Sequence, residues 1–280
     1  MVLEMLKTSS FDRVTRIDMA RSIAGRGRYW TTAYFVDGLM VDTGCAHSAR
    51  ELAAAMAAEP VAQIVNTHNH EDHIGGNAAL VRQHSGIKLL AHPLALPIMA
   101  NPRERQPLHP YRRLFWGWPE PSIGRPVHDG DLIWTEHHAF CVIHTPGHSP
   151  DHLCLLEEQR GWLFSGDLFV GGQDRALREG YDIWQIIDSL RVVAALPVKT
   201  LFPGSARIRE KPREELTAKI EYLERIGDRV LDLRRRGWTV GAIGRSLFGG
   251  PGLVEFLTLG HFSRQHLVLS YLTSASGHTS

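Results

Sequence analysis

Short apolar runs of strand length, separated by turns rich in glycine, proline and aspartate, fill the chain up to about residue 205. Such runs predict β-strands, and Asp37-Gly38 between two of them predicts a tight hairpin. The predicted strands are residues 14–23, 31–36, 39–41, 61–65, 88–91, 132–134, 140–143, 162–164 and 198–202. Helices are predicted at residues 48–58, 78–84 and 183–195, the last capped by Asp182, so the chain is of the α/β (α+β) class.

The remainder of the chain is predicted to be helical. Its longest helix is residues 213–236, where apolar side chains recur at steps of three and four, the spacing of one buried face. These side chains are Leu216, Ile220, Leu223, Ile226, Val230 and Leu233. Shorter helices are predicted at residues 238–248 and 261–272. We therefore expect a main domain at residues 1–210 and a helical extension at residues 211–280 packed on it.

Two segments show neither pattern. Residues 25–30 are predicted to be a loop between the first two strands. Residues 93–126 are rich in proline and carry Trp116 and Trp118 among arginines. Long irregular segments in compact domains are often lids or binding loops, so we expect residues 94–128 to shape a pocket. The alternative is that these aromatic side chains only attach the segment to the body.

Composition narrows the classes of partner. The chain has 280 residues, 43% hydrophobic residues and a formal net charge of +1. This is ordinary for a soluble globular protein and provides no general field for nucleic acid or an anionic membrane. No apolar run is long enough to span a bilayer, and we expect a cytoplasmic protein. Cys45, Cys141 and Cys154 are too few and too scattered for a disulfide framework.

The densest chemistry lies in residues 67–76, THNHEDHIGG, between a predicted strand and a predicted helix. His68 and His70 point the same way if the segment is extended, so both can reach one ion. Asp72 and His73 are displaced toward the helix and could serve a second ion. Imidazole and carboxylate together suit zinc, iron or manganese. The sequence therefore predicts a metal site at this strand end, and a merely polar loop is the weaker interpretation.

Two later strands also end in candidate ligands. Residues 144–152, HTPGHSPDH, follow the predicted strand 140–143 and contain His148, and residues 165–167, SGD, end another apolar run in Asp167. Several strands that each deliver a ligand at one end can build a site on the edge of a sheet. His152 is expected near the ligands rather than among them.

These stretches, together with VDTG at residues 41–44, resemble the successive motifs of the metallo-β-lactamase superfamily over about residues 30–205. Aspartate at position 72 resembles the glyoxalase II-like hydrolases more than the classical lactamases. The resemblance implies an αββα sandwich with residues 1–210 as the catalytic domain. It also implies that His68, His70 and His148 hold a first metal, that Asp72 and His73 hold a second, and that Asp167 bridges them. Asp42 would orient a ligand or hold a turn.

One position departs from the family pattern. The last ligand is usually a histidine after Pro-Gly, and here the residue after Pro203-Gly204 is Ser205. A neutral hydroxyl is a poor ligand beside imidazole. Water could complete the second site, His261 could replace the histidine, or a single metal could bind. We expect one tight Zn²⁺ and a second ion that is weak or absent, with Fe or Mn as alternatives to zinc.

The predicted activity is hydrolysis of a small ester-type substrate such as a thioester or a lactone. A metal in such a site lowers the pKa of its bound water from 15.7 to about 7, and Asp72 would orient the hydroxide as the catalytic residue. The strongest alternative is a persulfide dioxygenase-like protein with one iron on His68, His148 and Asp167. A lactamase-like phosphodiesterase and a non-catalytic binding protein are further alternatives. The expected partner is a small-molecule substrate, with a homodimer as an option.

Overall fold

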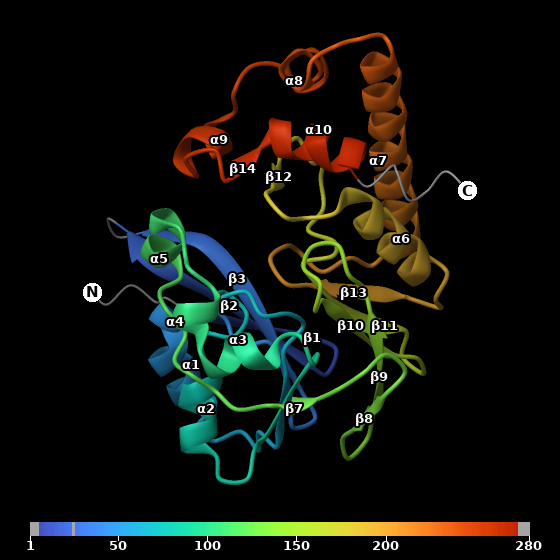
Figure 1. The fold of residues 1–280 in the computed structure, drawn as a ribbon. Helices are drawn as coiled ribbons and strands as arrows, with labels where there is room; N and C mark the ends of the chain where they lie inside the picture. The colour runs from blue at the N-terminus through green and yellow to red at the C-terminus, as the bar shows by residue number, and fades with distance from the viewer. Residues whose placement is uncertain (1–5, 24–25, 274–280) are drawn as a thin grey trace.

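A computed structural model describes residues 6–23 and 26–273 and shows two β-sheets packed face to face, with helices outside both (Figure 1). The first sheet has the order β1-β2-β3-β4-β5-β6-β7, and the second has the order β13-β11-β10-β9-β8. The strands of the first sheet are β1 (Leu6–Phe11), β2 (Val14–Ile23), β3 (Arg26–Val36), β4 (Leu39–Val41), β5 (Gln63–Val65), β6 (Lys88–Ala91) and β7 (Arg125–Pro126). Those of the second are β8 (Leu132–Trp134), β9 (Ala139–His144), β10 (Leu153–Glu157), β11 (Trp162–Gly166) and β13 (Thr200–Pro203).

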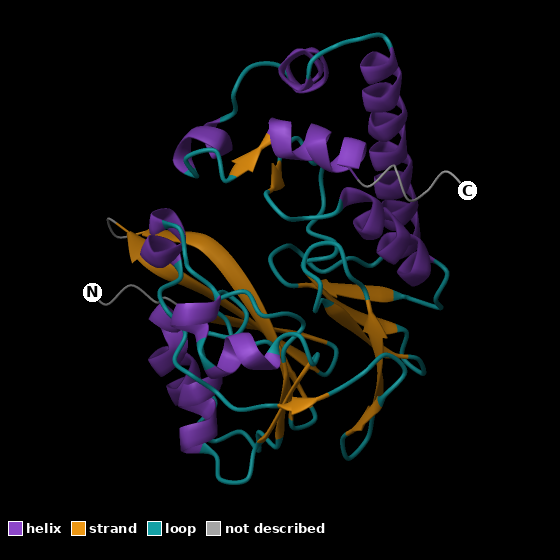
Figure 2. Ribbon diagram, in the orientation of Figure 1, coloured by secondary structure: helices purple, strands orange, loops and turns teal. Residues whose placement is uncertain are grey.

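Helices cover the outer face of each sheet, which gives the four layers of an αββα sandwich (Figure 2). The helices associated with the first sheet are α1 (Ala49–Ala55), α2 (Asn77–Gln83), α3 (Leu96–Ala100), α4 (Pro102–Arg105) and α5 (Pro110–Phe115). Those that follow the second sheet's strands are α6 (Ile183–Ala194), α7 (Pro212–Arg235), α8 (Val240–Phe248), α9 (Leu253–Leu257) and α10 (Arg264–Thr273). The predicted fold class is thus confirmed.

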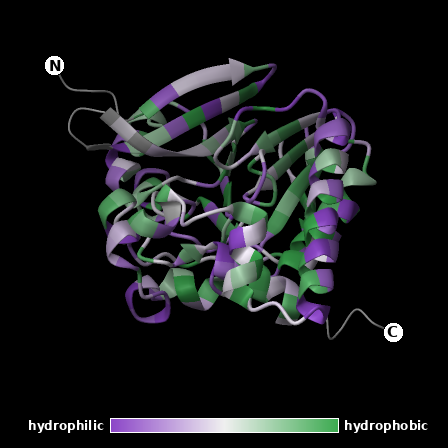
Figure 3. Ribbon diagram, turned by 90° about the horizontal axis from the view of Figure 1, so that it is seen from above, coloured by the Kyte–Doolittle hydropathy of each residue, from purple (hydrophilic) through white to green (hydrophobic). Residues whose placement is uncertain are grey.

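Three apolar clusters separate the four layers, because alternate residues of a strand face opposite sides of its sheet. On β11, Phe164 points between the two sheets, whereas Leu163 points toward α6 and α7. On β3, Tyr34 points between the sheets and Phe35 toward the helices of the first sheet. Seen from above, the strands inside the molecule are mostly hydrophobic in colour (Figure 3). The central strands of each sheet are therefore buried on both faces, whereas the edge strands β1, β7 and β8 are largely exposed.

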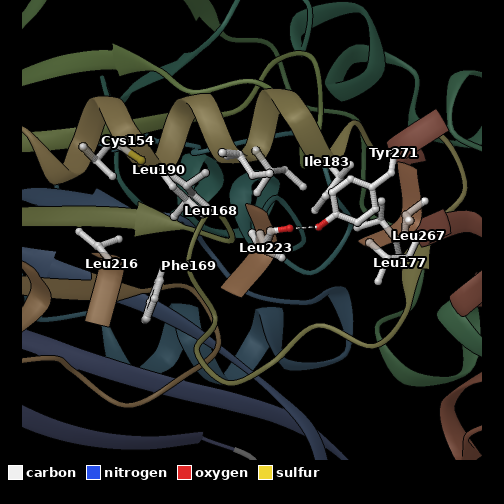
Figure 4. Packing of buried hydrophobic residues seen from close by; sticks show 14 of the residues in the cluster. Cys154, Leu168, Phe169, Leu177, Ile183, Leu190, Leu216, Leu223, Leu267 and Tyr271 are labelled. Carbon is white, nitrogen blue, oxygen red and sulfur yellow. Dashed lines mark hydrogen bonds between the residues drawn. The ribbon is translucent and has the colours of Figure 1, made fainter. Parts of the chain in front are cut away.

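The cluster on the outer face of the second sheet joins the C-terminal helices to the rest of the chain. It contains Leu190 of α6, Leu223 of α7, and Leu267 and Tyr271 of α10 (Figure 4). The buried Tyr271 hydroxyl donates a hydrogen bond of 2.7 Å to the carbonyl oxygen of Leu223. The described part of the predicted helical extension therefore shares a hydrophobic core with α6 and the second sheet.

Several local predictions match the structure, and others were wrong. Asp182 caps α6 by accepting hydrogen bonds from the backbone N–H groups of Trp184 and Gln185, as predicted. The loop predicted at residues 25–30 belongs to β3 from Arg26 onward, because pairing with β2 extends the strand beyond its apolar part.

Among the described residues, no helix has the length and apolar character needed to cross a membrane.

The largest differences come from pairings between distant segments. A small sheet pairs β12 (Leu177–Arg178) with β14 (Phe262–Ser263), and neither strand was predicted. The helix expected at residues 261–272 consequently starts later, as α10. Such short strands are stabilised by each other rather than by any local periodicity. Their pairing brings the C-terminal region next to the segment that follows β11.

Candidate metal centre

The candidate ligands gather where β4, β5, β9 and β11 end, at one edge of the sandwich. The loop from β5 to α2 carries His68, His70, Asp72 and His73. The two sheets are joined at this edge by a backbone hydrogen bond of 2.8 Å from the Leu153 N–H to the Thr67 carbonyl and by one of 2.7 Å from the Thr32 N–H to the Gly204 carbonyl. These links fix the loops of both sheets relative to each other.

A first group of ligand atoms comes from His68, His70 and His148, and all lie within 4.8 Å of one another. The Nδ1 atom of His70 lies 2.8 Å from Nε2 of His68 and 3.1 Å from Nε2 of His148. His68 and His70 are buried and His148 is half-buried. Three imidazole nitrogens therefore converge on one point, as the motifs predicted.

A second group shares His68 and adds His73 and Asp167, again within 4.8 Å. The Nε2 atom of His73 lies 3.5 Å from Oδ2 of Asp167 and 3.9 Å from Oδ2 of Asp72. The same Asp167 oxygen lies 3.7 Å from Nε2 of His148. Asp167 therefore lies between the two groups, while Asp72 lies at the edge of the second.

Buried hydrogen bonds to Nδ1 of His68 and of His73 orient these two rings. Asp42 Oδ2 accepts from the Nδ1 of His73 at 2.7 Å, so the Nε2 of this ring faces the second group. The other contacts of Asp42 are with Thr67, whose backbone N–H and hydroxyl donate to the carboxylate at 2.7 and 2.8 Å. The Thr67 hydroxyl also lies 3.0 Å from Nδ1 of His68. Asp42 thus has the positioning contacts that the resemblance implied.

His152 and Gly204 hold Asp167 in place. The backbone N–H of Asp167 donates to Nε2 of His152 at 3.2 Å, and the Nδ1 of His152 lies 2.8 Å from the Thr145 hydroxyl. Both ring nitrogens of His152 are therefore engaged away from the ligand groups. A Cβ atom at Gly204 would come within 2.8 Å of Asp167 Oδ1 and of His73 Cε1, so only glycine fits there without displacing a candidate ligand.

The electrostatics keep most of these histidines neutral. Burial lowers the pKa of His68, His70 and His152 well below the ordinary histidine value. Burial also lowers the pKa of His148 to about 3, although Asp167 opposes this shift. A neutral imidazole keeps a lone pair on one ring nitrogen, which is the form that binds metals.

The remaining histidine and the carboxylates behave differently. Burial alone lowers the pKa of His73, but Asp42, Asp167 and Asp72 outweigh it and raise the pKa well above its usual value. Burial raises the pKa of Asp167, but the positive charge of His73 outweighs this and holds the pKa below its usual range. Burial raises the pKa of Asp72. Without a metal, the three carboxylates favour the charged form of His73, and a bound cation would compete with that proton.

The donor set fits a transition metal. The Nε2 atom of His73 is buried and has no hydrogen-bond partner. Imidazole nitrogens in a tight group, with a carboxylate between them, are the donors that zinc and iron bind in proteins. His68, His70 and His148 could hold one ion, and His73, Asp167 and Asp72 could contribute to a second.

Ser205, at the position where the motif pattern led us to expect a histidine, lies beside the second group. Its hydroxyl lies 3.4 Å from Asp167 Oδ1. His261, which the sequence left open as a replacement, does not approach the ligands. Its Nδ1 lies 2.8 Å from the Tyr111 hydroxyl, and its Nε2 accepts from Arg178 at 3.1 Å. Within the described residues, His261 belongs to neither ligand group.

A cavity of about 330 Å³ opens beside the candidate ligands His70, Asp72, His148 and Asp167. Most of its other walls are aromatic or aliphatic: Tyr29, Trp30, Trp116, Leu168, Val170, Leu177, Tyr181, Ile186 and Phe262. Trp116 comes from the irregular segment and Phe262 from the C-terminal region, so both contribute to the cavity, as predicted for the segment at residues 94–128.

The local motifs contained no signal for three polar residues at this site. Arg112, on α5, lines the cavity and pairs with Glu71. The guanidinium Nη1 of Arg178 lies 2.8 Å from Nε2 of His70, and the Tyr181 hydroxyl lies 3.3 Å from Nε2 of His148. All three reach the ligands through the folding of distant segments.

Known proteins with similar sequences indicate the family of this chain. Residues 29–205 match the family model of the metallo-beta-lactamase superfamily. The chain is 26% identical over 211 residues to an atrochrysone carboxyl ACP thioesterase of Aspergillus fumigatus, an alignment that covers 72% of this chain and 59% of that protein. It is 27% identical over 207 residues to a lactamase-like protein, nscB, of the same species, covering 68% of this chain and 54% of that protein. The chain thus spans between half and three fifths of these relatives.

Solved structures share the fold at lower identity. A metallo-beta-lactamase family protein from Thermus thermophilus is 18% identical, with a TM-score of 0.67 over 94% of this chain and 92% of that one. The metallo-beta-lactamase FIM-1 from Pseudomonas aeruginosa, in a mono-zinc form, is 18% identical, with a TM-score of 0.61 over 79% of this chain and 95% of that one. Motifs, ligand geometry, fold and family match agree, and the chain belongs to the metallo-β-lactamase superfamily.

Proposed function

We propose that this protein is a metal-dependent hydrolase of small acyl thioesters, with a ligand pattern like that of the glyoxalase II-like members of the superfamily. The observation that carries the proposal is the convergence of His68, His70, His148 and Asp167 beside a mostly apolar cavity, which the last three of them line. The curated relative named as an ACP thioesterase supports the choice of a thioester. In the reaction, water adds to the thioester carbonyl, the carbon–sulfur bond breaks, and a carboxylic acid and a thiol leave.

When bound, the metal supplies Lewis acidity and lowers the pKa of a coordinated water toward neutrality. The protein's own residues have three tasks. His68, His70 and His148 hold the ion, and Asp167 spans the two ligand groups. Asp72 orients the attacking water, because its carboxylate lies at the edge of the cavity. The apolar walls bind the acyl group and exclude bulk water, which strengthens electrostatic interactions at the reacting carbonyl.

We further propose one tight zinc ion in the first group and a weaker or absent ion in the second. Ser205 supports this, since a hydroxyl replaces an imidazole beside Asp167. Metal analysis of protein purified without added metal tests it. One tightly held equivalent, rising toward two in Ser205→His, is expected, whereas two tight equivalents in the parent would contradict it. The same analysis distinguishes zinc from iron and manganese.

A substrate panel tests the activity. Thioester, lactone, β-lactam and phosphodiester substrates are offered to the parent, to His148→Ala and to His128→Ala, an exposed histidine outside both ligand groups. Thioester turnover that disappears only in His148→Ala is expected. A preference for phosphodiesters, or turnover that survives His148→Ala, would contradict the proposal. Binding without turnover of any substrate would favour a non-catalytic role.

The arrangement of His68, His148 and Asp167 also favours a second candidate, an iron-dependent persulfide dioxygenase. Two histidines and one carboxylate suit non-haem iron, and Ser205 removes a ligand that a two-metal site would use. Oxygen uptake with glutathione persulfide by iron-loaded protein, absent from zinc-loaded protein, would establish this activity. The lack of uptake would remove it.

A further inference from the structure

Helix α5 places Arg112 against the loop that carries the candidate ligands. The residue is only 4% exposed, and its Nε donates a hydrogen bond to the carboxylate of Glu71, which is fully buried. Its Nη2 lies 3.9 Å from Oδ1 of Asp72. Its Cζ lies 5.6 Å from the centre of the Trp116 ring. The guanidinium is thus fixed beside Asp72 at the wall of the cavity.

The guanidinium of Arg112 is charged and has unused donors. Burial lowers its pKa, but Glu71 and Asp72 outweigh burial and raise the pKa above the usual arginine value. Only Nε donates a hydrogen bond to a described residue, and Nη1 is buried without a partner. Nη2 lies 3.9 Å from Oδ1 of Asp72 and makes no hydrogen bond within the described residues, so it can donate to an oxygen atom that a ligand supplies.

The same region is where a second metal ion would sit. The second ligand group lacks an imidazole at Ser205, and His261 is engaged elsewhere. A cation bound to Asp72 would be repelled by a guanidinium on the same carboxylate, since a low dielectric strengthens like-charge repulsion. The missing imidazole and the positive charge of Arg112 both weaken the binding of a second cation.

We propose that Arg112 supplies, beside Asp72, the positive charge that a second metal ion would otherwise supply. It weakens cation binding at Asp72 and donates a hydrogen bond to the carbonyl oxygen of the acyl substrate, which gains negative charge as water adds. The chemical class it recognises is thus an acyl carbonyl beside the first metal. The inference rests on the metal centre proposed above.

The decisive experiment measures the zinc Kd of the second site by chelator competition in a Ser205→His background. Arg112→Met removes the charge while it keeps an unbranched side chain beside Trp116. It is expected to tighten the second site by about tenfold or more, because repulsion is removed. Arg112→Gln, which can still donate to Glu71, is a second neutral variant with the same expectation should Arg112→Met not fold.

Two control variants follow. One keeps a positive charge at position 112, and the other removes the charge of a neighbouring arginine instead. Arg112→Lys retains a cation near Asp72 and is expected to keep the second-site Kd closer to that of the Ser205→His protein than either neutral variant does. Arg113→Met alters the exposed neighbour on α5, which lies over Trp118, and is expected to have no effect. An unchanged Kd in both neutral Arg112 variants would overturn the proposal. Two tightly bound ions in the parent, with Arg112 intact, would also overturn it.

Kinetics provide an independent readout. In the parent background, Arg112→Met is expected to lower kcat for a thioester by about 100-fold with little change in KM, as when one oxyanion donor is removed. Arg112→Lys should restore part of this loss. Loss of binding alone, seen as a raised KM with unchanged kcat, would overturn the role at the carbonyl. If the parent binds one zinc but cleaves no thioester, the substrate assignment fails while the Kd comparison still decides the role of Arg112.

Discussion

Replacement of Asp42 tests whether contacts behind the ligands hold them in place. Asp42 is 2% exposed, and its carboxylate accepts three hydrogen bonds, two from Thr67 and one from His73. Asp42→Ala leaves these donors without the carboxylate, and an unsatisfied buried donor costs about 1–3 kcal/mol. Asp42 also has a φ of 60°, where alanine adds about 1 kcal/mol. We therefore expect the free energy of unfolding to fall by about 4 kcal/mol or more in Asp42→Ala.

Two matched variants separate these contributions. Asp42→Asn tolerates the backbone conformation and keeps one acceptor oxygen, so a loss of about 2 kcal/mol is expected. Asp12→Ala changes an aspartate at a φ of 52° whose carboxylate makes only an exposed ion pair with Arg160 at 3.9 Å, so it reports mainly the backbone cost. Urea unfolding of metal-free protein measures all three. Zinc titration should show a loss of affinity of about 10- to 100-fold in Asp42→Ala. A free energy of unfolding for Asp42→Ala within about 0.5 kcal/mol of that of the parent would refute the reasoning.

Further predictions concern other parts of the site. Gly204→Ala should displace Asp167 or His73 and weaken zinc binding by titration, because its Cβ would lie 2.8 Å from an atom of each. Trp116→Ala should raise KM for an apolar thioester and leave the metal content unchanged, since Trp116 lines the cavity without belonging to a ligand group. Burial lowers the pKa of His261 to about 3. As the pH falls below about 6.5, His261 therefore binds a proton in the unfolded chain but not in the folded protein. Stability should therefore decrease from pH 7 to pH 5, and His261→Gln should make that decrease smaller by up to about 1 kcal/mol in urea unfolding.

The candidate ligands were accessible to sequence reasoning because each lies in a short stretch directly after a strand. The apolar period located the strands, and the imidazoles of His68, His70 and His148 followed them within a few residues. Strand ends at one edge of a sandwich bring such residues together. The structure joins these same side chains, and their role as metal ligands stays a prediction, as does the division of the chain at residue 210.

Arg112, Arg178 and Tyr181 could not be predicted in the same way. Arg112 reaches Asp72 only because α5, in a segment without sustained period, folds back over the ligand loop. Arg178 lies on β12, which is paired with β14 from a distant part of the chain. Neither placement is encoded in a local pattern of apolar residues, and arginines in loops are usually solvated. The family resemblance ends at about residue 205 and gave no information on β14.

Anomalous diffraction from crystals grown with zinc, recorded at the zinc edge, tests the central claim most directly. A peak about 2.0–2.1 Å from Nε2 of His68, Nδ1 of His70 and Nε2 of His148 is expected, the usual zinc–nitrogen distance. A second peak beside Asp72 should be weak or absent. Zinc bound elsewhere, or no peak among these three nitrogens, would contradict the account.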